Sequence, residues 1–175
     1  MLRMKRVKTP LKNKHIGLQN LETQLALWKS QGLSICFTNG CFDLLHLGHV
    51  TYLGEAAKYA DILLVGVNSD RSVKALEKSP ERPINDEISR AKVVAALESV
   101  DGVVIFDEDT PLELIKKSTP NVLVKGGDYN PDEENPENPK YIVGREHVLK
   151  NGGIVKTIGL VDGFSTTNVI QKLKR

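Results

Sequence analysis

The most restrictive feature of this sequence is a short turn, around residues 39–49, that joins a strand pattern to a helix pattern. Residues 33–38 form an apolar run that ends at Asn39-Gly40 and is too short for a helix, so the run predicts a buried strand. Apolar residues then recur at helical spacing beyond Gly48, namely Val50, Leu53, Ala56, Ala57 and Ala60. We therefore expect a strand, a glycine turn and a helix in direct succession.

Two histidines, His46 and His49, lie three residues apart where this helix is predicted to begin, and therefore on one side of it. Unpaired backbone N–H groups and the positive end of the helix dipole favour an anion at the same place. Gly48, between the histidines, allows a ligand to approach closely. We interpret the stretch as a cradle for nucleotide phosphates, with a helix cap or a pair of metal ligands as the alternatives for the two histidines.

Four further apolar runs predict strands, and helix patterns separate them. The predicted strands are residues 62–68, 102–106, 122–125 and 154–158, and the predicted helices include residues 18–28, 88–97, 111–117, 141–150 and 169–173. Continuously apolar strands are typical of parallel sheets that are covered on both faces. We predict an α/β fold with a Rossmann-like, doubly wound, five-stranded parallel sheet in one domain at residues 18–175, after a basic, flexible tail at residues 1–17.

Composition excludes several classes of protein. The 175 residues, 40% hydrophobic and 26% charged, suit one soluble domain, and no apolar run or signal sequence indicates a membrane, so a cytoplasmic location is expected. A net charge of +2 does not indicate nucleic acid binding. Cys36 and Cys41 are too few for a disulfide framework or a four-cysteine zinc site, and a Cys41 nucleophile lacks an oxyanion-hole pattern.

Residues 38–49, T-N-G-C-F-D-L-L-H-L-G-H, closely resemble the first motif of the cytidylyltransferase-like nucleotidyltransferases, whose hallmark is H-x-G-H. Within this family, the sequence resembles the heptose 1-phosphate adenylyltransferase branch in particular. The resemblance covers about residues 21–173. A second signature of the family is the Ser-Thr-Thr run, here Ser165, Thr166 and Thr167, at the start of the last helix. Many relatives carry Arg-Thr where this chain has Leu160 and Val161, a departure that fits the heptose branch.

The resemblance implies an enzyme that transfers AMP from ATP to D-glycero-β-D-manno-heptose 1-phosphate, yielding ADP-heptose and pyrophosphate for a surface glycan such as the lipopolysaccharide core. It implies Mg²⁺ bound through substrate phosphates, with no protein ligand assigned. Homodimers are common among relatives, although the sequence leaves the oligomeric state open. The implied catalytic residues are His46 and His49. The implied nucleotide-binding residues are Thr38, Asn39, Gly40, Cys41, Phe42, Arg90, Gly127, Asp128, Ser165, Thr166 and Thr167.

A cationic segment follows the strand predicted at residues 62–68. Ligands in open α/β sheets bind beyond the carboxyl ends of the strands, so Lys74, Lys78 and Arg82 are expected at the phosphate of the acceptor. The alternative is a solvated loop, and the choice between Lys74 and Lys78 stays open. Arg90 lies near the start of a helix capped by Asn85 or Asp86. The alternative to a phosphate contact for Arg90 is a surface ion pair with Asp86 or Glu87.

Residues 130–140 carry four acidic residues and three prolines, and we expect a solvated loop rather than a metal site. Two other functions remain open. One is a transferase of the same family that makes a CDP-alcohol or a GDP-heptose, for example from glycerol 3-phosphate. The other is a module that senses ATP without turnover. The chain has no G-x-G-x-x-G or Walker lysine motif, which argues against a dehydrogenase or a P-loop kinase.

Overall fold

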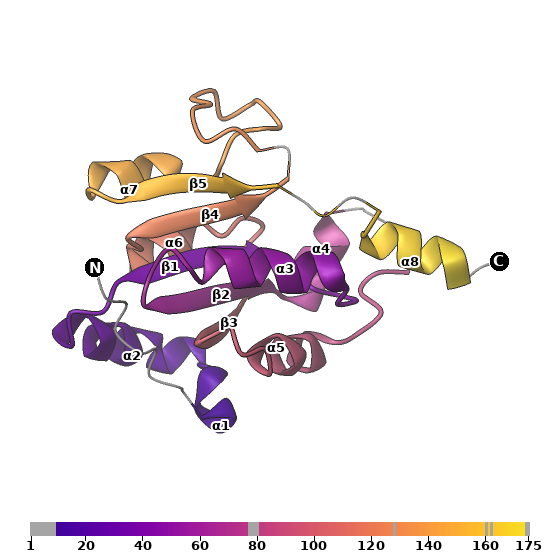
Figure 1. Cartoon of the computed structure of the whole chain (residues 1–175), viewed down its shortest axis with the longest axis horizontal. Coiled ribbons are helices and arrows are strands. Elements are labelled where there is room, and N and C mark those ends of the chain that lie inside the picture. Colours follow the sequence, from indigo (N-terminus) through magenta and orange to yellow (C-terminus); the bar gives the residue numbers. More distant parts are fainter. Residues whose placement is uncertain (1–9, 77–80, 128, 160, 162, 174–175) are drawn as a thin grey trace.

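The structure is a computed structural model that describes residues 10–76, 81–127, 129–159, 161 and 163–173. All five strands are parallel and form one sheet in the order β3-β2-β1-β4-β5 (Figure 1). Their bounds are β1 (Ile35–Gly40), β2 (Ile62–Asn68), β3 (Gly102–Phe106), β4 (Val122–Gly126) and β5 (Ile154–Ile158). The predicted Rossmann-like, doubly wound sheet is confirmed, and β2, β3 and β5 have the predicted bounds.

The helices of the described residues are α1 (Leu11–Lys14), α2 (Leu18–Ser30), α3 (Leu47–Ala56), α4 (Asp70–Ala75), α5 (Glu87–Ala95), α6 (Leu112–Ser118), α7 (Arg145–Lys150) and α8 (Thr166–Leu173). The short helix α4, predicted as loop, is capped by Ser69, whose side chain accepts a hydrogen bond from the Ser72 N–H group. Helix α7 is predicted to begin at residue 141. It begins later, at Arg145, because Gly144 before it has a left-handed φ of +87°. Within the described ranges, no helix has the length and apolar character needed to cross a membrane.

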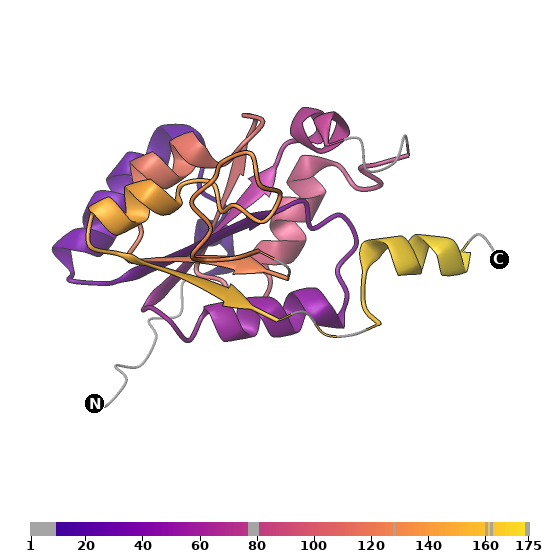
Figure 2. The ribbon, with the colours of Figure 1, turned by 90° about the horizontal axis from the view of Figure 1, so that it is seen from above.

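The two faces of the sheet pack against different helices, as the view along the sheet shows (Figure 2). Alternate side chains of β1 point to opposite faces, so Cys36 joins the cluster under α3 and α5, whereas Phe37 joins the cluster under α2, α6 and α7. Every residue of β2 is buried, as expected for a central parallel strand. Coverage on both faces leaves the carboxyl ends of the strands as the open edge of the sheet.

The strand order reverses between β1 and β4, because the chain goes from β1 to β2 and β3 on one side and returns to β4 and β5 on the other. Ligands of open α/β sheets bind at such a reversal, beyond the carboxyl ends of the strands. Helix α8 lies beyond this edge, near the start of α3 (Figures 1 and 2). The two sequence motifs therefore meet at one edge of the sheet.

The segment before α2 packs on the domain. Ile16 is buried and its N–H group donates to the Val103 carbonyl at 2.8 Å, while His15 forms a parallel bridge with the same residue. The Lys14 ammonium donates to the Leu97 carbonyl at 3.0 Å. The predicted tail of residues 1–17 thus includes a part that covers the edge strand β3, and its residues 1–9 lie outside the described residues.

Candidate functional site

A cavity of about 810 Å³ lies at the carboxyl edge of the sheet, where the strand order reverses. Its walls come from the ends of β1 and β4, the starts of α3 and α8, and the loop at residues 129–143. Its volume is within the range of sites that hold nucleotide-sized ligands. The predicted site residues that line it are Asn39, Gly40, Cys41, Phe42, His46, His49, Arg82, Ser165, Thr166 and Thr167.

The two histidines form a stacked pair at the start of α3, with ring centroids 3.8 Å apart and an angle of 25° between the planes. His46 occupies the N-cap position, but its side chain makes no capping hydrogen bond. Both Nδ1 atoms are buried without a hydrogen-bond partner among the described residues. Both rings line the cavity, and His49 also forms a hydrogen bond with the backbone of Leu44, which holds its ring against the turn.

Burial lowers the pKa of both histidines from the ordinary value of 6.5. For His49, burial and then the charge of His46 bring the pKa to about 4. Both rings are therefore neutral near pH 7 in the protein without ligand. A bound polyphosphate would favour the charged form and oppose this shift.

Because the pKa of His49 is lower in the folded state, the unfolded chain binds more protons between pH 6.5 and pH 4. The free energy of unfolding should therefore fall as the pH is lowered through this window. We expect a contribution of about 1–3 kcal/mol, reduced from the full linkage value because the ring is partly exposed to solvent. Urea denaturation at several pH values, with His49→Asn for comparison, measures it: equal pH dependence of the two proteins would contradict the assigned pKa.

Gly48 allows the two signature segments to approach each other. A Cβ atom at this position would lie 3.0 Å from Nδ1 of His46 and 3.5 Å from Cβ of Phe164, just before α8. A side chain here must displace the His46 ring, while alanine in a helix is otherwise favoured over glycine. Gly48→Ala is expected to lower kcat about tenfold without lowering the melting temperature. Steady-state kinetics and a thermal melt test this expectation, and unchanged kcat would show that the ring has room to move.

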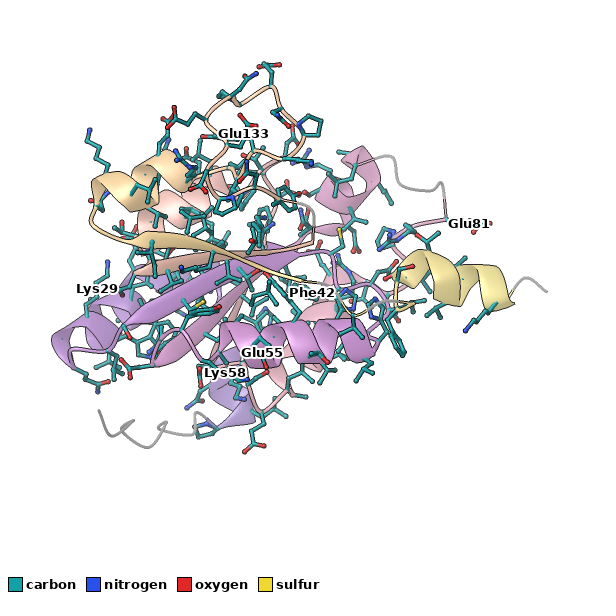
Figure 3. All side chains as sticks on the ribbon, turned by 45° about the horizontal axis from the view of Figure 1, so that its top comes forward. Lys29, Phe42, Glu55, Lys58, Glu81 and Glu133 are labelled. Carbon is teal, nitrogen blue, oxygen red and sulfur yellow. The ribbon has the colours of Figure 1, made fainter. Side chains whose placement is uncertain are left out.

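Phe42 lies where β1 ends, beside the start of α3 and towards α8 (Figure 3). Its backbone has a left-handed φ of +49°, unusual for a residue with a side chain, and its ring centroid lies 5.4 Å from that of His49. A Cβ atom at Gly40 would lie 3.1 Å from the Phe42 ring. The conformation of this turn therefore packs the Phe42 ring on the His49 ring.

Asp43, which the sequence did not single out, ties this turn to the segment before α5. Its carboxylate accepts hydrogen bonds from the Arg82 guanidinium at 3.0 Å and from the N–H groups of Ile84 and Asn85 at 2.8 and 3.0 Å. The carboxylate is fully buried, and the Arg82 side chain is 10% exposed. This network holds Arg82 in the cavity wall.

Arg90 lies outside the cavity wall. Its guanidinium is buried and donates to the carbonyls of Cys41 and Asn85 and to the Asp70 carboxylate, the last at 2.7 Å. Its ion pair is therefore with Asp70 rather than with Asp86 or Glu87, the neighbours considered from the sequence. Asp86 instead caps α5 by accepting from the Ser89 N–H group.

Several other predicted residues are not part of the cavity wall. Thr38 is buried and its hydroxyl shares a hydrogen bond of 2.6 Å with the Tyr52 hydroxyl, which donates to the Val124 carbonyl at 3.2 Å. Lys74 is exposed on α4, and the Gly127 N–H group donates to the Ile158 carbonyl. Lys78 and Asp128 lie outside the described residues.

The cavity wall also includes residues that the sequence did not indicate as site residues. They are Tyr52, Asn68, Leu76, Asp109, Thr110, Pro111, Lys125, Tyr129, Pro139, Tyr141, Val143 and Phe164. Gly48, expected to let a ligand approach closely, also lines the wall, as does Gly126 at the end of β4. Several belong to the acidic loop at residues 130–140 and to the residues on either side of it. This loop projects away from the sheet around Glu133 (Figure 3). The Asn130 N–H group donates to the Lys140 carbonyl at 2.9 Å and closes the loop at its base, which brings Tyr129 and Tyr141 to the site together.

The cavity wall offers few ligands for a metal ion. Among the described residues, no three His, Cys, Asp or Glu side chains are grouped closely enough to hold one. Asp109, an acidic residue of the cavity wall, pairs with Arg71 at 3.0 Å. These groups fit Mg²⁺ that enters on substrate phosphates better than a metal ion held by protein ligands.

The chain is similar to proteins of one family over most of its length. Residues 37–172 match the family described as cytidylyltransferase-like. The bifunctional protein HldE of Geotalea uraniireducens (strain Rf4) is 51% identical over 160 residues, which are 90% of this chain and 31% of that protein. The chain thus spans about three tenths of the length of such curated relatives.

Two solved structures are similar in fold. The lipopolysaccharide core biosynthesis protein from Thermoplasma volcanium GSS1 is 28% identical, with a TM-score of 0.56 over 74% of this chain and 98% of that one. Pantothenate synthetase from Thermus thermophilus is 13% identical, with a TM-score of 0.56 over 89% and 67% of the two chains, and shares the fold alone.

Proposed function

The chain belongs to the cytidylyltransferase-like nucleotidyltransferases, and from this membership we propose that it transfers AMP from ATP to D-glycero-β-D-manno-heptose 1-phosphate, yielding ADP-heptose and pyrophosphate. The stacked His46–His49 pair, in one cavity with the hydroxyls at the start of α8, is the observation that carries this proposal. The heptose acceptor is supported by the resemblance of both signature segments to the heptose branch, and by similarity to a lipopolysaccharide core biosynthesis protein.

In the proposed reaction, a phosphate oxygen of the sugar 1-phosphate forms a bond to the α-phosphorus of ATP. The bond between this phosphorus and the bridging oxygen of pyrophosphate breaks on the opposite side, and no covalent intermediate with the protein is required. Catalysis then depends on positioning and on charge stabilisation. The Nε2–H groups of His46 and His49 would donate to oxygens whose negative charge grows as pyrophosphate leaves.

The start of α8 offers a second set of donors to the triphosphate. Ser165, Thr166 and Thr167 line the same cavity, and their hydroxyls adjoin the N-terminus of a helix. The approach of Phe164 to Gly48 at the start of α3 supports a role for these hydroxyls at the outer phosphates, opposite the histidines. Gly40, Cys41 and Phe42 would line the path of the triphosphate between the two helices.

The remaining assignments rest on the resemblance to the family, and of these residues Arg82 lines the cavity. Arg82 is proposed at the acceptor phosphate, with Lys74 and Lys78 as further candidates, and Gly127 and Asp128 at the nucleotide ribose. Mg²⁺ bound with ATP supplies charge neutralisation on the phosphate oxygens. A homodimer is proposed from its frequency among relatives, and a cytoplasmic location from the need for ATP. Arg90 and Thr38 would act on the nucleotide only through the backbone that they hold.

The test is pyrophosphate release with Mg²⁺ from each of ATP, CTP, GTP and UTP, offered with the heptose 1-phosphate or with glycerol 3-phosphate. Turnover confined to ATP with the heptose phosphate is expected. Turnover with another pair would support the proposed mechanism but assign a different nucleotide or acceptor as the substrate. Tight ATP binding with no pyrophosphate from any pair would indicate a sensing module instead.

A further inference from the structure

A buried lysine at the end of β4 lies in the wall of the same cavity. Lys125 is 9% exposed, and its ammonium contacts the side-chain oxygen of Asn39, at the end of β1. The centroid of the Tyr129 ring lies 5.7 Å from Nζ. The ammonium therefore lies between the ends of the two strands where the strand order reverses, which is the position at which α/β sheets bind their ligands.

The depth of this position strengthens the interaction of the ammonium with a bound anion. Lys125 is only 9% exposed and lines the cavity, so its charge is presented within the cavity rather than on the outer surface. Solvent screens a charge less where protein walls surround it, and its attraction to a phosphate is then stronger than at an exposed site. A contact with Asn39 keeps the side chain directed along the edge of the sheet.

The order of groups along the cavity indicates which phosphate lies beside Lys125. Tyr129 and Tyr141 provide aromatic surface suited to a base, and Gly126 allows a ribose to approach closely. The start of α8, proposed for the outer phosphates, lies against the start of α3, where a Cβ atom at Gly48 would be 3.5 Å from Cβ of Phe164. The α-phosphate connects the ribose to these outer phosphates, and its place in this order is next to Lys125.

We infer that Lys125 is a further catalytic residue, whose ammonium binds a non-bridging oxygen of the α-phosphate, and that Asn39 positions it. This inference rests on the proposed nucleotidyl transfer. The α-phosphorus is the atom attacked, so its oxygens carry charge throughout the substitution and the ammonium stabilises them in the ground state and the transition state.

The test compares Lys125→Met and Lys125→Arg with the control Lys116→Met, whose exposed ammonium pairs with Glu113 at 2.8 Å on α6. Lys125→Met is expected to lower kcat/KM for ATP about 10²-fold and to weaken MgATP binding, measured by calorimetry, about tenfold. Lys125→Arg should recover part of both losses, and Lys116→Met should match the wild type. Met retains the apolar stem, so the melting temperature should stay close to that of the wild type.

Asn39→Asp provides a second test that keeps Lys125 in place. A carboxylate beside the ammonium would compete with the phosphate, and MgATP binding is expected to weaken about tenfold. If Lys125→Met binds MgATP within threefold of the wild type, the inference is overturned. If Lys125→Met does not fold, the same result for Asn39→Asp overturns it. If the wild type binds MgATP and releases no pyrophosphate with any acceptor, the proposed function fails, while the binding comparison still tests the contact of Lys125.

Discussion

Replacing His49 by alanine is expected to lower kcat by about 10²-fold or more, the largest loss of activity predicted for this protein. The ring stacks on His46 at 3.8 Å in the cavity wall, where it is proposed to donate to a phosphate oxygen. Removing one donor to charge that develops in a transition state has costs of this size. The loss should appear in kcat and in kcat/KM together, because the donor acts mainly as pyrophosphate leaves.

His147→Ala is the matched control, because this histidine lies on α7 and its Nε2 atom contacts the Thr119 hydroxyl at 3.3 Å, outside the cavity wall. It should leave kcat unchanged. The double variant of His46 and His49 should lose little more than the worse single variant, since groups that act on the same charge are not additive. Activity of His49→Ala within a factor of two of the wild type would end the catalytic assignment of that histidine.

Arg90→Met is expected to produce the largest loss of stability, about 3 kcal/mol in the free energy of unfolding. The guanidinium is buried and donates to two carbonyls and to the Asp70 carboxylate, so its removal leaves all three acceptors without this partner. Removing one member of a buried ion pair costs several kcal/mol for that reason. The estimate lies at the low end because the Asp70 side chain is 34% exposed and can be hydrated.

Urea denaturation measures this loss, with Arg71→Met as the control. Arg71 also pairs with carboxylates, those of Asp107 and Asp109, but on the exposed surface, where ion pairs contribute little to stability. Its replacement should leave the denaturation midpoint nearly unchanged. If Arg90→Met is as stable as the wild type and instead raises KM for ATP, then Arg90 contacts phosphate in the complex, as the sequence pattern predicted.

Local sequence patterns were sufficient to predict the sheet and the first motif. Apolar runs of strand length, such as residues 62–68, bury both faces of a parallel strand, and this requirement is visible in consecutive residues. His46, Gly48 and His49 are likewise close in sequence, so the start of one helix brings the two rings together, with His46 at its N-cap position. The short helix α4 was missed because six residues, of which Ser72 and Val73 are buried, carry no helical repeat.

Contacts between distant segments decided the rest of the site. Arg90 and Lys125 are both basic residues near the proposed phosphate site. The Arg90 guanidinium donates to the Cys41 carbonyl, whereas Lys125 lines the cavity. That difference depends on the position of α5 against the turn after β1 and of β4 beside β1, over separations of 49 and 86 residues. Sequence periodicity specifies which face of an element is buried, whereas the partner of a polar side chain is specified only when the packed elements bring donor and acceptor within about 3 Å.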